Sequence, residues 1–204
     1  MKRGFTLIEM LVVIGIIAIL VGAGMTSFSS ATKSAQKAQA QELVSNVATA
    51  LDVVYQKEGA WPRKVFDKAS GEFLVDEEVA YELAKRNVMS LRYDSAQKKT
   101  VAADRFGIVS PWAQKLIGRK AGSGLSSGSK VPTGGTIKDH IVRYAIDKEG
   151  LGIVEAKVGD ATIRIRATAV AWCCGADGKF SDYFSSGRSK SDDVYSWSQQ
   201  QVVK

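Results

Sequence analysis

The chain begins with an apolar run of membrane length. Residues 5–24 are almost all apolar, and one carboxylate, Glu9, interrupts them. A helix over these residues is roughly 30 Å long, which is enough to cross a hydrocarbon core. Lys2 and Arg3 precede the run, and the positive-inside rule therefore predicts a cytoplasmic N-terminus. An acid inside such a helix costs about 2.5–3.5 kcal/mol or more, so Glu9 is expected to have a function.

The apolar run alone leaves two simpler interpretations open. A cleaved secretory signal has a shorter apolar stretch followed by small residues, and Ala23-Gly24-Met25 offers small residues. A plain uncleaved membrane anchor is the other interpretation, but it leaves Glu9 unexplained.

The helical pattern continues beyond the apolar run. Residues 26–57 contain neither proline nor glycine. Apolar residues recur there at spacings near three and four, which predicts an apolar stripe: Ala31, Ala35, Ala38, Leu43, Val47, Ala50, Leu51 and Val54. Gly59 suits a C-terminal cap and Pro62 prevents further helix. We therefore predict one helix of about fifty residues, far above the ordinary mean, whose second half packs on a globular domain.

The remaining chain predicts an α+β domain. Residues 76–86 have a helical pattern with early acids and late bases, and Asp76 is a suitable N-cap. Residues 92–120 give no clear pattern. Three segments, 141–146, 151–158 and 161–167, are expected to form an antiparallel meander, with a tight turn at Gly159-Asp160. Residues 161–167 alternate cleanly, which places Arg164 and Arg166 on one face of the sheet.

The N-terminus resembles the prepilin signature of type IV pilins and type II secretion pseudopilins. The matching residues are Gly4-Phe5-Thr6-Leu7-Ile8-Glu9. This resemblance implies that a prepilin peptidase cleaves between Gly4 and Phe5, and that Phe5 is then N-methylated. It also implies a pilin-like fold, with a long N-terminal helix packed on a C-terminal antiparallel sheet and an additional short helix.

The resemblance gives Glu9 a role in assembly. The resemblance implies that this glutamate meets the N-terminal amine of a neighbouring subunit, and such pairing relieves the cost of burying the acid. The alternative is that Glu9 merely snorkels or is protonated. Many family members carry a helix-kinking proline at the position of Thr26; here Gly22 and Gly24 precede it instead. We expect any local melting in a filament to centre on these glycines, unless they simply allow close helix packing.

The resemblance also implies an organisation, a location and partners. Residues 1–4 are the leader, 5–25 the membrane or filament-core helix, 26–58 its amphipathic continuation, and 59–204 the globular domain. The protein is expected in the bacterial inner membrane as a single-pass protein with a periplasmic domain, or outside the cell if it forms a surface pilus. Expected partners are further copies, other pilins or pseudopilins, the peptidase and an inner-membrane assembly platform.

A C-terminal segment resembles the calcium loop of major pseudopilins. Gly175-Ala176-Asp177-Gly178 is followed by an acidic pair and by Trp197. The resemblance implies calcium ligands at Asp177 and at Asp192 or Asp193, and calcium prefers six to eight oxygen ligands. The alternative is a simple turn at Asp177 and a solvated acidic pair. The loop between them is longer than usual and carries three cations.

Composition adds little to this interpretation. The net charge is +7, which is expected to mark a solvated surface. DNA binding by the Arg164 and Arg166 face is an alternative, and nucleic acid is not an expected partner. Cys173 and Cys174 are adjacent, so a loop disulfide between them is not expected, and two small buried side chains are. The single histidine, His140, is expected to be structural or exposed, and we expect no enzymatic activity.

Overall fold

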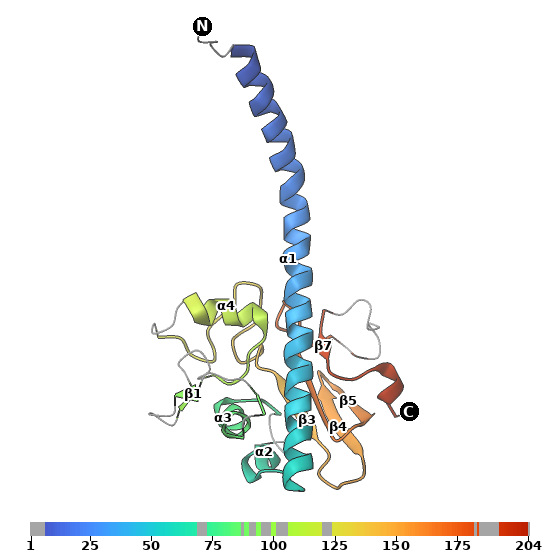
Figure 1. The fold of residues 1–204 in the computed structure, drawn as a ribbon. Helices are drawn as coiled ribbons and strands as arrows, with labels where there is room; N and C mark the ends of the chain where they lie inside the picture. Colours follow the sequence, from blue (N-terminus) through green and yellow to red (C-terminus); the bar gives the residue numbers. More distant parts are fainter. Residues whose placement is uncertain are drawn as a thin grey trace. The chain divides into compact units, whose positions relative to one another are not determined.

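The chain forms two compact units, Met1–Gln36 and Lys37–Lys204. The computed structural model describes residues 7–68, 73–86, 88–89, 93–94, 99–100, 106–119, 124–181, 183 and 192–203. A long N-terminal helix, an antiparallel sheet and a few short helices make up an α+β pilin-like fold, as predicted (Figure 1).

Helix α1 runs over Leu7–Glu58, and its residues from Lys37 onward belong to the second unit. It ends where the sequence predicts. Gly59 adopts a left-handed conformation with φ of 67°, and its N–H donates to the carbonyl of Tyr55 at 2.8 Å. The Trp61 ring then stacks on Tyr55 at 4.7 Å between centroids. The glycine is required here because a side chain rarely adopts this backbone conformation.

One face of α1 is buried in the second unit. The buried residues follow a four–three spacing and face one another along the helix: Ala40, Val44, Val47, Ala50, Leu51 and Val54. From Val47 onward the stripe predicted from sequence is buried, whereas Ala31, Ala35 and Ala38 are exposed in the single chain. Alanine carries little apolar surface, so its spacing alone does not determine which face is buried.

The central sheet of the second unit has the order β3-β6-β7. Its antiparallel strands are β3, Arg143–Ile146; β6, Ala169–Cys173; and β7, Val194–Tyr195. Tyr144, Ala171 and Cys173 lie in the same hydrophobic cluster as the buried face of α1. Ala145, Val170 and Trp172 lie in a second cluster on the other face of the sheet. The sheet is therefore covered on both faces.

A separate hairpin contributes to that second cluster. It consists of β4, Ile153–Val158, and β5, Ala161–Arg166, joined by the predicted turn at Gly159. Its inward residues include Val154, Ala156, Ile163 and Ile165, which pack with Val170 and Trp172. The predicted alternation in β5 is confirmed, since Arg164 and Arg166 are exposed.

The predicted three-stranded meander is wrong. Strand β3 pairs with β6, and β4 pairs only with β5 among the described strands. Strand β6 is AVAWC, of which four residues are buried. A strand that is buried on both faces shows no alternation of apolar and polar residues, so its sequence lacks the strand period.

Short elements complete the described chain. They are α2, Arg63–Lys68; α3, Glu77–Lys85; α4, Pro111–Arg119; β1, Tyr93–Asp94; β2, Lys99–Thr100; and the 3-10 helix η2, Gln199–Gln201. The helix predicted over 76–86 is confirmed. The Asp76 carboxylate accepts hydrogen bonds from the N–H groups of Glu78 and Val79, as an N-cap does.

Candidate functional site

The N-terminal segment of α1 is exposed within its unit and apolar on every side. Glu9 lies in the first helical turn and is also exposed. Gly4 and Phe5, the residues of the predicted cleavage site, lie outside the described residues. The exposed large apolar side chains around Glu9 are Leu7, Ile8, Met10, Leu11, Val12, Val13, Ile14, Ile16, Ile17, Ile19, Leu20 and Val21.

These side chains cover the whole circumference of the helix. Successive residues of an α-helix are rotated by about 100°, so the consecutive positions 10–14 face all directions. A helix that is apolar all round is stable only when lipid or other helices cover it. Glu9 is the one carboxylate in this stretch. Its place in the first turn suits the positive end of the helix dipole.

Comparison with known families matches the prokaryotic N-terminal methylation motif to residues 1–25. The match supports a prepilin-type protein, in the class that contains type IV pilin-like proteins and pseudopilins. No curated protein and no solved structure matches the chain.

The expected membrane-spanning segment, residues 5–25, remains a prediction. In the part of the chain that the structure describes, no helix meets the length and hydropathy needed to cross a membrane.

The predicted calcium ligands lie in a loop that follows β6. The carboxylates of Asp192 and Asp193 accept hydrogen bonds from backbone N–H groups of residues 175–181. Asp177 accepts from the N–H of Lys179, two positions along its own turn. Among the described residues, no group of three or more acidic, histidine or cysteine side chains is placed to hold a metal ion. The structure therefore does not bring these three aspartates together as a set of ligands.

A buried polar cluster surrounds His140. The sequence did not predict this cluster. The Nε2 atom of His140 lies 2.9 Å from the carbonyl of Gly134, so this nitrogen donates the hydrogen bond. Its Nδ1 lies 2.9 Å from the Ser110 hydroxyl and 3.6 Å from the Cys174 sulfur. The Cys174 thiol lies 3.2 Å from the carbonyl of Asp139, and burial raises its pKa. His140 therefore joins three segments, and the predicted structural role fits this geometry.

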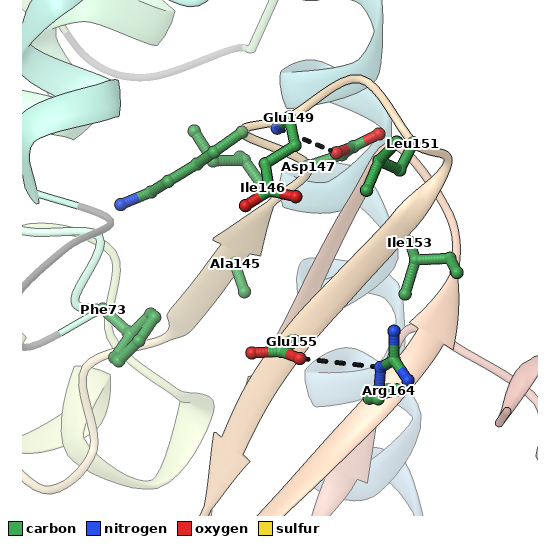
Figure 2. Close-up of a pocket in the computed structure, with 10 residues that line it drawn as sticks. Phe73, Ala145, Ile146, Asp147, Glu149, Leu151, Ile153, Glu155 and Arg164 are labelled. Carbon is green, nitrogen blue, oxygen red and sulfur yellow. Dashed lines mark hydrogen bonds and ion pairs between the residues drawn. The ribbon is translucent and has the colours of Figure 1, made fainter. Parts of the chain in front are cut away.

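A cavity of about 430 Å³ lies beside the hairpin of β4 and β5. Figure 2 shows Phe73 and Ala145 on one side of it, and Glu155 and Arg164 on the other. Glu155 pairs with Arg164 at 3.5 Å across the hairpin, which offsets part of the positive charge expected on this face. The Asp147 carboxylate accepts three backbone N–H bonds from its own turn, at 2.5–3.2 Å. Asp147 and Glu155 therefore have structural partners at the edge of this cavity.

Proposed function

We propose that this protein is a structural subunit of a pilus-like filament. A prepilin peptidase removes the leader after Gly4, and the new terminus at Phe5 is methylated. One observation carries the proposal: a helix that is apolar on all sides has a single carboxylate, Glu9, inside a segment that matches the methylation motif. Such a helix needs a cover, and neighbouring copies of the same helix provide one.

Glu9 determines how the copies align in this proposal. Cleavage creates a positively charged amine at Phe5, close in sequence to Glu9. In a bundle of helices, the carboxylate of one subunit pairs with the amine of its neighbour. An unpaired charge is costly in an apolar bundle. Misalignment of one subunit therefore destabilises the bundle by more than the correctly formed ion pair stabilises it. Glu9 therefore sets the axial register of assembly.

Within this class we propose a type II secretion pseudopilin that acts in protein export. The segment from Gly175 to Trp197 resembles that group, and Cys173 and Cys174 are free and buried instead of closing a disulfide loop. The second unit then lies in the periplasm of a bacterium whose inner membrane holds the precursor. The alternative is a type IV pilus subunit in adhesion, motility or DNA uptake.

Processing provides the first test. Mass spectrometry of the protein from its own cells should show a chain that starts at Phe5 and carries one N-methyl group. A chain that still starts at Met1, or that starts after Ala23, contradicts the proposal.

A deletion strain separates the two subclasses. Loss of exported proteins from the medium, with normal surface filaments, supports the secretion pseudopilin. Loss of surface filaments with normal export supports the pilus subunit instead.

A further inference from the structure

We infer that Asp192 and Asp193 hold the C-terminal loop, residues 175–181, through backbone N–H groups and without a calcium ion. The resemblance of this segment to pseudopilins implies a calcium site at these acids. The hydrogen bonds of the loop assign them a different partner, which we call the carboxylate clamp: Asp192, Asp193 and the N–H groups that they accept from.

The clamp joins the segment after β6 to the start of β7. Asp193 accepts from the N–H of Gly175 at 3.1 Å and from the N–H of Ser181 at 2.8 Å. The Tyr195 hydroxyl donates to the same carboxylate at 3.2 Å. Asp192 accepts from the N–H of Ala176 at 2.7 Å. Two adjacent acids therefore hold both ends of the loop.

This geometry is the reverse of a cation site. Calcium is bound by six to eight oxygen atoms, and backbone carbonyls usually supply several of them. In the clamp, backbone N–H groups point their positive ends at the carboxylates. Both Asp193 oxygens are engaged, and its side chain is almost fully buried at 6% exposure. Hydrogen bonds to the ionised form stabilise a buried carboxylate, so no cation is needed to neutralise it.

The glycine that opens the loop also has a role without calcium. A Cβ atom at Gly175 would lie 1.9 Å from Cγ of Asp192, so any other residue at this position would displace that carboxylate. Gly175 therefore allows the carboxylate to approach the backbone closely enough to accept its N–H bonds. The first glycine of the Gly-Ala-Asp-Gly sequence is thus explained by the clamp as well as by the resemblance.

The first test measures calcium binding directly. The full-length protein is purified in detergent, stripped with a chelator and titrated with calcium chloride in a calorimeter, and its melting temperature is recorded with calcium and with chelator. We expect no binding heat and the same melting temperature in both conditions. Saturable binding at micromolar to millimolar calcium, or a calcium-dependent rise in melting temperature, overturns the inference.

The second test uses variants of the clamp. Asp193→Asn replaces an acceptor oxygen by an NH₂ group that faces N–H donors, and should lower the melting temperature by about 5 °C or more, equally with and without calcium. Asp192→Asn should have a smaller effect, because Asp192 accepts one of the four bonds described above. Glu149→Gln, at an exposed acid of the same unit, is the matched control and should leave the melting temperature unchanged.

An Asp193→Asn variant as stable as the wild type contradicts the clamp. If that variant does not fold, the calcium titration of the wild-type protein still decides between clamp and ion. Neither result depends on filament assembly, so the inference and the proposed function fail separately.

Discussion

The two units place their apolar residues in opposite ways. In the first unit, large apolar side chains from Leu7 to Val21 are exposed, whereas the second unit buries Leu51, Tyr144 and Trp172 completely. The second unit buries its large apolar side chains within one chain, whereas the first unit leaves them exposed. Stability therefore depends on the second unit, and we attribute assembly to the first. Substitutions in the two units should separate these properties.

The largest expected effect on stability comes from a matched pair of leucines. Leu51→Ala removes a side chain with 0% exposure and should lower the free energy of unfolding by about 2–5 kcal/mol. Leu11→Ala removes a side chain with 59% exposure and should change it by less than about 0.5 kcal/mol. Urea unfolding of the full-length protein in detergent, followed by tryptophan fluorescence, measures both. Equal losses of unfolding free energy in the two variants would contradict the assignment of stability to the second unit.

The same contrast explains what could be predicted from sequence. The prepilin-type motif at residues 1–25 could be predicted because its signal is local: an apolar run, one acid and a short sequence pattern. The end of α1 and the N-cap Asp76 were also predicted, since caps and turns depend on neighbouring residues. These features need no information about distant parts of the chain.

Long-range pairing could not be predicted. Strand β6 is buried on both faces and shows no alternation, and β7 has two residues, so the order β3-β6-β7 was missed. The cluster of Ser110, His140 and Cys174 joins residues that are 30 and 34 positions apart. The role of Asp193 depends on donors 12 and 18 positions away. No local sequence pattern predicts such contacts.

The next effect concerns stability at alkaline pH. Burial raises the pKa of Cys173 from an ordinary 9.0 to about 12, and also raises that of Cys174. The folded state therefore keeps these protons after the unfolded state has lost them, so the free energy of unfolding should fall as pH rises from about 9 to about 12. Urea unfolding at several pH values measures this slope. The double variant Cys173→Ala and Cys174→Ala should reduce it, and an unchanged slope would contradict the assignment.

A smaller effect is expected at the Tyr144 hydroxyl, which donates to the carbonyl of Val65 at 2.7 Å. Tyr144→Phe leaves that carbonyl without its donor, so the free energy of unfolding should fall by about 1–2 kcal/mol. Tyr55→Phe is the control, because it keeps the ring that stacks on Trp61. The prediction fails if the two variants are equally stable in urea.

The smallest effect is expected at the cap of α3. Asp76→Ala should cost about 1 kcal/mol, because it removes the acceptor for two N–H groups. Asp76→Asn keeps the cap and removes the ion pair with Lys68, whose pKa the hydrogen bond to Asp76 raises. Because that ion pair is partly exposed, Asp76→Asn should lower the free energy of unfolding by less than Asp76→Ala does. Thermal unfolding of both variants gives the comparison, and a larger cost for Asn would contradict a capping role.

The central claim is that Glu9 aligns subunits during assembly, and filament yield tests it most directly. Glu9→Ala and the control Glu149→Gln, at an exposed acid of the second unit, are expressed in a strain that lacks the wild-type protein. Sheared filaments are quantified, and cleavage after Gly4 is checked by mass spectrometry. We expect both variants to enter the membrane and be cleaved, with filaments lost in Glu9→Ala and retained in Glu149→Gln. Normal filament yield from cleaved Glu9→Ala protein would contradict the claim.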